Sequence, residues 1–422
     1  MGAGRGKITA IILAAGLSSR MGAFKPLLEV GGKPALRYLV DHILEAGIDE
    51  VFIVTGHEAE RIERIADGCA TVFNPDFRRG MFTSVKAGLM AAAARGGFEG
   101  AMLFPVDAPF TPAKVIEALA DRAAESPGAF AVPCFMGKKG HPLFIPADKF
   151  DEILAYEGEG GLGALTSRSK GFIYMETGCE GVVLDMDTPE GYEEALDYLK
   201  GSREGRDDLV VPAFEGRLIA IRHGSTVKHK GKIFLGRADV ALSDKGRAEA
   251  AKAAEDLIRM GAGAGRIYAS GLRRAKETAE IIAARLSAEG ALGLPVGIIE
   301  APALREMSLG DWDGKYIDDI RESDPEGYME RGRDILRYKR PGGENFYDLR
   351  YRVFKGLRRI AAREAAEGAK DLIVVTHLGV IRALSSLITG KGAEDAWGEE
   401  FARGSVTAFY CRGKAENDCP IL

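Results

Sequence analysis

The stretch ITAIILAAGLSSRMGAFK, residues 8–25, decides how the first half of the chain folds. Its first six residues are mostly branched and apolar, as in a buried strand, and a loop of small and polar residues follows. Leucine, valine and isoleucine then recur at helical spacing over residues 36–44, until Gly47 ends the predicted helix. The sequence therefore predicts a strand, a loop and a helix, which is the repeating element of an α/β protein.

The same alternation continues through the chain. In the first half, predicted strands at 51–55, 70–73 and 101–106 alternate with helices near 58–66 and 84–94. After a polar segment the pattern restarts, with strands at 218–221, 266–269, 372–376 and 406–410 and helices at 244–260, 273–284, 347–364 and 380–388. We predict an α/β fold of two domains, each a mostly parallel sheet flanked by helices. The expected bounds are 1–200 and 217–422, with a linker at 201–216.

Composition favours small-molecule substrates. The chain has 422 residues, and its 62 acidic and 57 basic side chains give a net charge of -5, which does not attract nucleic acid or anionic membranes. No apolar run reaches the ~20 residues that span a bilayer, so we expect a cytoplasmic protein. The five cysteines are odd in number and form no CxxC pair, so neither a disulfide framework nor a zinc site is expected.

The loop after the first strand is the first candidate site, because ligands of open α/β sheets bind at the carboxyl ends of strands. Small residues there let backbone N–H groups approach phosphate oxygens, and two basic side chains add positive charge. The expected nucleotide-binding residues of this loop are Leu13, Ala14, Ala15, Gly16, Arg20 and Lys25. The loop is not a Walker sequence, since no Gly-Lys pair is followed by serine or threonine.

The pattern LAAGxSxRMGxxK, residues 13–25, resembles the fingerprint of the MobA-like nucleotidyltransferases, and the resemblance extends over about 200 residues. It implies a Rossmann-like nucleotidyltransferase fold and a second nucleotide-contacting segment with Asn74, Gly80 and Ser84. The sequence FPVDAP at 104–109 resembles the family's metal motif, and GHP at 140–142 and DMDTP at 185–189 resemble its later signatures. The form LAAG is more similar to the cytidylyltransferases that act on molybdopterin than to the guanylyltransferases.

Nucleotidyl transfer brings two anions together and needs a hard cation held by carboxylates. Asp107, at a predicted strand end, is the expected Mg²⁺ ligand, and Asp185 or Asp187 would complete the site. An isolated aspartate before Ala-Pro is more often a turn residue, and the upstream fingerprint is what favours a metal role here. His141 has two open interpretations, a substrate contact or a histidine packed in its loop.

A second candidate site follows the restart of the pattern. The predicted strand at 218–221 runs into Arg222-His223-Gly224, and another apolar strand runs into His377-Leu378-Gly379. Each histidine alone would more often be a packed residue than a catalyst. If the two strands lie side by side, however, both histidines face one pocket.

These residues resemble the histidine phosphatase superfamily, which includes phosphoglycerate mutases and α-ribazole phosphatase. The matching segments lie at 222–226, 242–246, 270–279, 304–314, 341–344 and 376–377. The resemblance implies that His223 attacks phosphorus, that Arg222, Arg274 and His377 neutralise the phosphoryl oxygens, and that Glu306 protonates the leaving group. It implies no metal for this domain. Ser225 and Leu378 depart from the commoner residues of the family, which bears on substrate preference.

We therefore predict a bifunctional enzyme. Its first domain would transfer a nucleotidyl group, with Mg²⁺, from a nucleoside triphosphate such as CTP to a phosphorylated cofactor precursor such as molybdopterin. Its second domain would hydrolyse a phosphomonoester through a phosphohistidine. A molybdoenzyme or its chaperone is an expected partner. Two alternatives stay open: a nucleotidyltransferase and α-ribazole phosphatase of cobalamin nucleotide-loop assembly, and a nucleotide-sensing domain that regulates the phosphatase.

Overall fold

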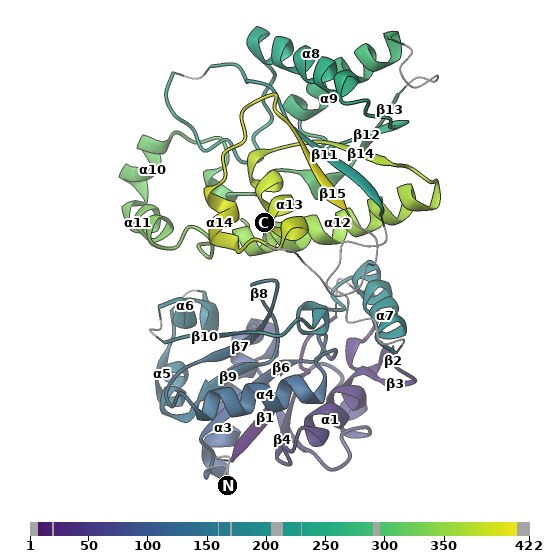
Figure 1. Ribbon diagram of the computed structural model, residues 1–422. Coiled ribbons are helices and arrows are strands. Elements are labelled where there is room, and N and C mark those ends of the chain that lie inside the picture. Colours follow the sequence, from purple (N-terminus) through teal and green to yellow (C-terminus); the bar gives the residue numbers. More distant parts are fainter. Residues whose placement is uncertain are drawn as a thin grey trace. The chain divides into compact units, whose positions relative to one another are not determined.

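The chain forms two compact units, residues 1–208 and 209–422. The computed structural model describes residues 7–18, 21–158, 160–168, 171–203, 214–228, 230–289 and 296–411 (Figure 1). Each unit has its own central sheet with helices packed against it. Each is therefore an α/β fold of mostly parallel strands, as the alternation of strands and helices predicts.

The first unit is built on an eight-stranded sheet with the order β10-β7-β9-β6-β1-β4-β5, and β8 pairs with β7. A small two-stranded sheet accompanies it. The strands are β1 (Ile8–Leu13), β2 (Glu29–Val30), β3 (Lys33–Pro34), β4 (Val51–Thr55), β5 (Ala70–Phe73), β6 (Gly100–Pro105), β7 (Ala131–Phe135), β8 (Lys138–Lys139), β9 (Leu143–Pro146) and β10 (Ile173–Glu176). Strand β1 is central, with parallel neighbours β4 and β6. Among the described strands of the large sheet, only β8 and β9 pair antiparallel with their neighbours.

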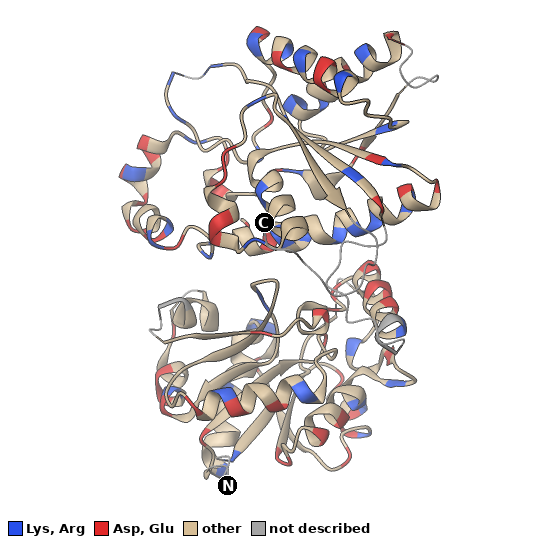
Figure 2. Ribbon diagram, viewed as in Figure 1, with Lys and Arg blue, Asp and Glu red and all other residues tan. Residues whose placement is uncertain are grey.

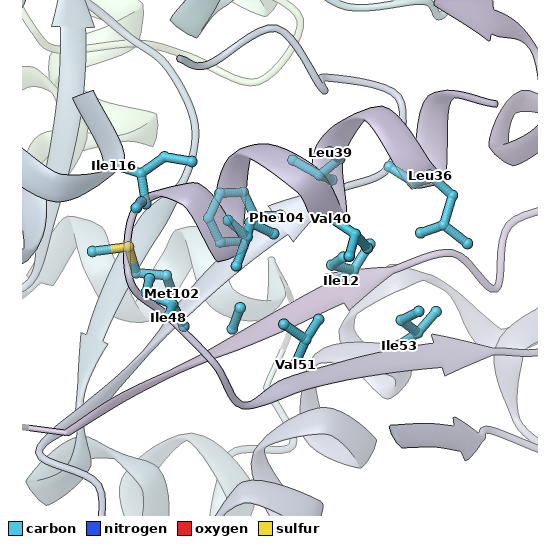
Figure 3. Close-up of a cluster of buried hydrophobic side chains, with 14 of the residues drawn as sticks. Ile12, Leu36, Leu39, Val40, Ile48, Val51, Ile53, Met102, Phe104 and Ile116 are labelled. Atoms are coloured by element: carbon cyan, nitrogen blue, oxygen red, sulfur yellow. The ribbon is translucent and has the colours of Figure 1, made fainter. Parts of the chain in front are cut away.

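The helices of this unit are α1 (Ala35–Glu45), α2 (Ala59–Glu63), α3 (Met81–Arg95), α4 (Ala113–Ala124), α5 (Phe150–Ala155), α6 (Gly161–Arg168) and α7 (Pro189–Arg203). One face of the sheet packs on α1 and α4. Figure 3 shows Ile12, Ile53 and Phe104, from three adjacent strands, turned towards Leu39 and the other apolar residues of α1. The opposite face packs on α3 and α5. The carboxyl ends of the strands are thereby held in fixed positions.

The second unit has a five-stranded sheet with the order β13-β12-β14-β11-β15. Its strands are β11 (Gly216–Arg222), β12 (Arg266–Ala269), β13 (Gly297–Glu300), β14 (Asp371–Thr376) and β15 (Val406–Cys411). Its helices are α8 (Asp244–Arg259), α9 (Arg273–Ala288), α10 (Ile317–Ser323), α11 (Pro325–Arg333), α12 (Phe346–Ala366), α13 (Leu378–Thr389) and α14 (Ala393–Gly398). Of the strands that the structure describes here, β15 alone runs antiparallel to its neighbour. Helices α8 and α9 cover one face of the sheet, and α12 and α13 cover the other.

The segment predicted as a linker, 201–216, differs from that expectation at its ends. Helix α7 continues to Arg203, and Phe214 is buried in the core of the second unit, two residues before β11 begins. Residues 204–213 lie outside the described residues. The apolar side chain of Phe214 explains why it is buried in this core.

Charged side chains of both signs are interspersed on the helices, and the central strands carry few of them (Figure 2). Such a surface is typical of proteins that use charged groups to bind particular ligands. It is not typical of proteins that bind polyanions such as nucleic acid. Among the described residues, no helix combines the length and the apolar character needed to cross a bilayer.

Gly88 sets the distance between α3 and the central strand. A Cβ atom at this position would lie 2.4 Å from Ile11 Cγ2 and 3.1 Å from Val54 Cγ2. We expect Gly88→Ala to destabilise the first unit by about 1–3 kcal/mol, because overpacking outweighs the gain of up to ~1 kcal/mol in helix propensity. Urea unfolding followed by far-ultraviolet circular dichroism would measure this.

Gly163 is the matched control, since a Cβ there meets nothing within 4 Å in helix α6. Gly163→Ala should leave stability unchanged or raise it by up to ~1 kcal/mol. Both tryptophans, Trp312 and Trp397, belong to the second unit, so their fluorescence reports that unit separately. Equal or greater stability of Gly88→Ala would contradict the packing argument.

Candidate active sites

The loop after β1 leaves the sheet between two neighbouring strands. Ala14 N–H donates to Val54 O at 2.9 Å, and Val106 N–H donates to Leu13 O at 3.2 Å. Ala14 and Ala15 are buried, and a Cβ at Gly56 would lie 2.9 Å from Ala15 Cβ. Small side chains are therefore required where this loop passes between the strand ends.

A cavity of about 180 Å³ opens at this loop. Its lining includes seven of the residues expected from the sequence: Leu13, Ala14, Ala15, Gly16, Lys25, Ser84 and Asp107. Met81, in the first turn of α3, also lines it. The backbone N–H groups of a helix's first turn lack partners within the helix and favour a phosphate. Backbone N–H groups of the loop and of the first turn of α3 can thus bind a phosphate in this cavity.

Asn74 and Gly80 lie beside the cavity and do not line it. Asn74 is buried, and its Nδ2 donates to Thr83 Oγ1 and Ser84 Oγ at 2.9 Å each. Gly80 precedes α3 with a φ of 118°, a backbone conformation that favours glycine. Both residues fix the start of α3. Arg20 lies outside the described residues.

Lys25 contacts two of the three predicted metal ligands. Its Nζ donates to Asp107 Oδ2 at 2.9 Å and to Asp187 Oδ1 at 2.5 Å. Burial alone would lower the pKa of Lys25, but the hydrogen bonds to Asp187 and Asp107 raise it above its ordinary value. Asp185 is exposed and accepts from the N–H of Asp187 at 3.1 Å, so it holds the loop and is not part of the lysine contact.

The donor set fits a magnesium ion. The described residues contain no group of three or more His, Cys, Asp or Glu placed to hold a metal. Mg²⁺ is commonly bound, however, by one or two carboxylates together with water and substrate phosphates. Asp107 and Asp187 already converge on one cationic group, the ammonium of Lys25. They could hold such an ion once Lys25 turns to a phosphate.

His141 lies near the same carboxylates. Its backbone is fixed, since its N–H donates to Val182 O and its carbonyl accepts from Thr111 Oγ1, both at 2.8 Å. Burial lowers the pKa of His141, and the charges of Asp107 and Asp185 oppose that shift. The imidazole is therefore neutral at pH 7 and lies close to the charged end of the site.

In the second unit, the pairing of β11 with β14 brings the two histidines together. The strands are parallel neighbours with Arg222 opposite Thr376, and His223 N–H donates to Thr376 O at 2.9 Å. The rings of His223 and His377 lie 5.0 Å apart between centroids. The expectation that these strands are adjacent is confirmed.

The environment of His223 selects one tautomer. Nδ1 lies 2.8 Å from the carbonyl oxygen of Gly224, so it carries the proton and donates. Nε2 then carries a lone pair, which accepts a hydrogen bond from Arg274 Nε at 3.2 Å. Burial, followed by the charge of Arg274, holds the pKa of His223 well below its ordinary value. The imidazole is therefore an unprotonated base at neutral pH.

Arg274 is almost fully buried. Its two terminal nitrogens donate to the carbonyl oxygens of Ala238 and Gly236 at 2.7 Å each. Burial lowers the pKa of Arg274 to about 10, so the side chain stays charged at pH 7. A fixed cation beside an unprotonated nitrogen is an arrangement suited to a phosphoryl group.

Two further nitrogen atoms of this site are buried without a partner among the described residues: Arg222 Nε and His377 Nδ1. His377 Nε2 lies 2.7 Å from Ser270 Oγ, which leaves Nδ1 as the nitrogen without a contact. Buried polar groups are usually hydrogen bonded, so these atoms indicate that a ligand completes the site.

The side chain of Glu306 lies against Gly379, where the missing Cβ leaves room for its carboxylate. Its Oε2 accepts from Gly379 N–H at 3.3 Å, and a Cβ at 379 would lie 2.5 Å from its Oε1. Its negative charge acts on both Arg222 and Arg274. The structure thus brings together all five residues expected at this site: Arg222, His223, Arg274, Glu306 and His377.

Comparison with known proteins identifies both units. Residues 218–417 match the histidine phosphatase superfamily (branch 1), and residues 10–172 match the MobA-like NTP transferase domain. A glucosyl-3-phosphoglycerate phosphatase of Mycolicibacterium vanbaalenii is 33% identical over 206 residues, which are 48% of this chain and 86% of the relative. The chain belongs to the histidine phosphatase superfamily and carries a MobA-like NTP transferase domain.

Two other relatives agree with this assignment. Phosphoglycerate mutase-like protein 4 of Arabidopsis thaliana is 33% identical over 168 residues, 40% of this chain and 68% of the relative. An adenosylcobalamin/alpha-ribazole phosphatase of Salmonella typhimurium is 30% identical over 200 residues, 47% of this chain and 93% of the relative. This histidine phosphatase thus combines nucleotidyltransferase and phosphatase activities in one chain.

Sequence reasoning matched the motif at 341–344 but gave no role to Glu344. The structure places this carboxylate, which is partly buried, between two arginines. Its Oε2 accepts from Arg237 Nη2 at 3.1 Å, and Arg352 donates to both of its oxygens at 2.7 and 2.9 Å. The same two arginines donate to the backbone carbonyl of Glu306, Arg237 at 3.1 Å and Arg352 at 3.4 Å. Glu344 therefore positions Glu306 through both arginines.

We expect Glu344→Gln to weaken proton donation by Glu306. The loss in kcat/KM should be greater for alkyl phosphates, whose leaving groups need a proton, than for nitrophenyl phosphate, whose leaving group does not. We predict that the ratio of the two kcat/KM values changes by about tenfold, which corresponds to about 1.4 kcal/mol.

Glu364→Gln is the control. This buried glutamate bonds Tyr268 and Arg266 and has no contact with Glu306 among the described residues. It should lower stability and leave the ratio of the two substrates unchanged. An equal loss on both substrates in Glu344→Gln would show that Glu344 acts only on stability.

Proposed function

We propose that the first unit transfers a cytidylyl group from CTP to the phosphate of molybdopterin. The observation that carries the transferase site is the single cavity where the β1 loop, the start of α3, Lys25 and Asp107 meet. The similarity of LAAG to the molybdopterin cytidylyltransferases supports CTP and molybdopterin. An oxygen of the acceptor phosphate attacks the α-phosphorus, a new P–O bond forms, and the bond to the departing pyrophosphate breaks.

The residues of the chain bind and orient the triphosphate. Backbone N–H groups of residues 15–16 and of the first turn of α3 would hold its phosphates. Asp107 and Asp187 would bind Mg²⁺, which would neutralise charge on the phosphates. The ammonium of Lys25, which contacts the two carboxylates, would turn to the departing pyrophosphate and stabilise its charge. In this proposal Arg20 adds a second positive charge.

In the second unit we infer that His223 Nε2 attacks the phosphorus of a phosphomonoester. The unprotonated Nε2, whose lone pair accepts from the charged Arg274, supports this role. The N–P bond forms as the ester P–O bond breaks, and Glu306 gives its proton to the leaving alkoxide. Water then attacks the phosphohistidine, Glu306 accepts a proton from that water, and His223 is restored as phosphate leaves. Arg222, Arg274 and His377 would bind the equatorial oxygens.

A second candidate acceptor is a corrinoid phosphate. The 30% identity to an adenosylcobalamin/alpha-ribazole phosphatase favours it, because that relative's name places it in corrinoid chemistry. In that case both units would act in assembly of the cobalamin nucleotide loop.

The two sites can be separated by reciprocal substitutions in the full chain. We expect Asp107→Asn to lower pyrophosphate release about 10²-fold or more and to leave phosphate release from nitrophenyl phosphate intact. His223→Ala should give the opposite result, with a loss of at least about 10³-fold. Chelation with EDTA should stop only pyrophosphate release. Retained turnover in His223→Ala would refute the nucleophile, and a joint loss in both variants would refute the independence of the sites.

The acceptor and the nucleotide are tested by pyrophosphate release with each nucleoside triphosphate in turn. We expect release with CTP and molybdopterin, at a kcat/KM at least ten times that with GTP or ATP. Release with a corrinoid phosphate in place of molybdopterin would instead support the second candidate. Product analysis by mass spectrometry would identify the new diphosphate link between the cytidylyl group and the acceptor phosphate.

A further inference from the structure

Ser225 follows His223 by two positions, and each of its polar groups is bonded to helix α8 or its cap. Its N–H donates to Glu249 Oε2 at 2.6 Å, and its hydroxyl donates to Glu249 Oε1 at 3.0 Å. Its carbonyl oxygen accepts from the N–H and the hydroxyl of Ser243, the residue that caps α8, at 2.9 and 3.1 Å. The side chain of Ser225, which departs from the family's commoner residues, is thus bonded within the fold.

Two glycines bring this loop into backbone contact with the start of α8. A Cβ at Gly224 would clash with the carbonyl oxygen of Gly246, and a Cβ at Gly246 would clash with the carbonyl oxygen of Ser225. Glu249 is three residues beyond Gly246, on the same face of the helix, and its side chain is 21% exposed. The packing of α8 therefore sets the position of the Glu249 carboxylate beside the loop.

One peptide group connects Glu249 to His223. The peptide between Gly224 and Ser225 is trans and planar, so its N–H and its carbonyl point to opposite sides. On one side Glu249 accepts from the N–H of Ser225. On the other side the carbonyl of Gly224 accepts from His223 Nδ1 at 2.8 Å. Glu249 therefore fixes the orientation of the carbonyl that His223 contacts.

The orientation of this peptide decides which ring nitrogen of His223 carries the proton. With the carbonyl facing Nδ1, the proton is on Nδ1 and Nε2 keeps its lone pair. If the peptide turned over, the N–H of Ser225 would face Nδ1, and the favoured tautomer would carry its proton on Nε2. That tautomer has no lone pair at the atom that attacks phosphorus. Arg274 favours the productive tautomer from the other side, since its Nε donates to Nε2.

We propose that Glu249 is a positioning residue of the phosphatase, which holds His223 through the Gly224–Ser225 peptide in the tautomer with an unprotonated Nε2. A carboxylate suits this role, because hydrogen bonds to an ionised acceptor are roughly twice as strong as neutral ones. The hydroxyl of Ser225 keeps that carboxylate in place. The inference rests on the proposed role of His223 as the nucleophile, and it adds a residue on α8 that acts through the backbone.

The first measurement determines the tautomer in the full chain labelled with ¹⁵N-histidine. The ¹⁵N chemical shift separates a protonated from an unprotonated ring nitrogen, and loss of a signal in His223→Ala assigns His223. We expect the wild-type protein to carry the proton on Nδ1. Glu249→Ala removes both acceptor oxygens and should convert a measurable fraction of His223 to the tautomer with the proton on Nε2.

The second measurement is the rate of phosphate release. We expect Glu249→Ala to lower kcat/KM about 10- to 100-fold, the range for hydrogen bonds to charged groups. The factor should be the same for nitrophenyl phosphate and for an alkyl phosphate, because both need the same nucleophile. Competitive inhibition by inorganic phosphate should stay nearly unchanged, since Arg222 and Arg274 are intact. A merely structural role would weaken phosphate binding as well.

Two further substitutions separate the hydrogen bond from the charge and from folding. Glu249→Gln should keep most of the activity, because its amide oxygen still accepts from the N–H of Ser225, and the hydroxyl of Ser225 can accept from its amide nitrogen. Glu249→Met has a side chain of similar length without a comparable acceptor. It should behave like Glu249→Ala, and it provides the test if the alanine variant does not fold.

The control is Glu255→Ala. Glu255 is an exposed glutamate of the same helix, six residues and hence roughly 9 Å beyond Glu249. In the part of the chain that the structure describes, its side chain forms no ion pair or hydrogen bond. This substitution removes the same charge from α8 and should leave the tautomer and both rates unchanged.

The outcomes separate this inference from the proposed function. If His223 keeps its proton on Nδ1 in Glu249→Ala and Glu249→Met, the positioning role is overturned, and the phosphohistidine mechanism stands. A changed tautomer without a loss in kcat/KM overturns the role too, as does an equal loss in Glu249→Gln and Glu249→Ala. Turnover that survives His223→Ala overturns the mechanism and the positioning role with it.

Discussion

Parallel pairing of neighbouring strands is the constraint on which both sites depend. In the second unit the β11–β14 register sets Arg222 opposite Thr376, so the next residue of each strand is a histidine at the same edge. A shift of one residue would turn every side chain of the strand to the other face. In the first unit β1 lies between β4 and β6, which places the phosphate-binding loop next to Asp107. The residues of each site are distant in sequence and meet only through the sheet.

Burial determines the chemistry of the phosphatase site. A histidine in water is partly protonated near pH 6.5 and would be a poor nucleophile below that value. Burial and the neighbouring Arg274 lower the pKa of His223, so its Nε2 stays unprotonated while Arg274 remains charged. The backbone carbonyls of Gly236 and Ala238 make this possible, because they satisfy the buried guanidinium without neutralising it. The same packing that stabilises the unit thus maintains a cation beside a base.

Much of this architecture could be predicted from local patterns. Strand β12 has the bounds expected from its apolar run, and the two strand-end histidines follow directly from their motifs. Strands β8 and β9 could not be predicted, because they are short and pair antiparallel with partners fixed by the tertiary fold. The role of Glu344 also depends on contacts far apart in sequence, among them the hydrogen bond from Arg237, which is 107 positions away. A single sequence contains no local signal for such contacts.

The groups of the two sites differ in the sign of the charge that they present to a phosphate. In the phosphatase site, Arg222 and Arg274 offer positive charge directly, and the histidines remain neutral. In the transferase site, Asp107 and Asp187 share the single ammonium of Lys25, so these three groups keep one net negative charge. A triphosphate would be repelled by that charge unless the carboxylates also receive a cation. When Lys25 turns to the phosphates, two carboxylates are left facing each other, and a divalent ion restores neutrality. The balance of charge among these residues therefore supports the proposed binding of a divalent cation such as Mg²⁺.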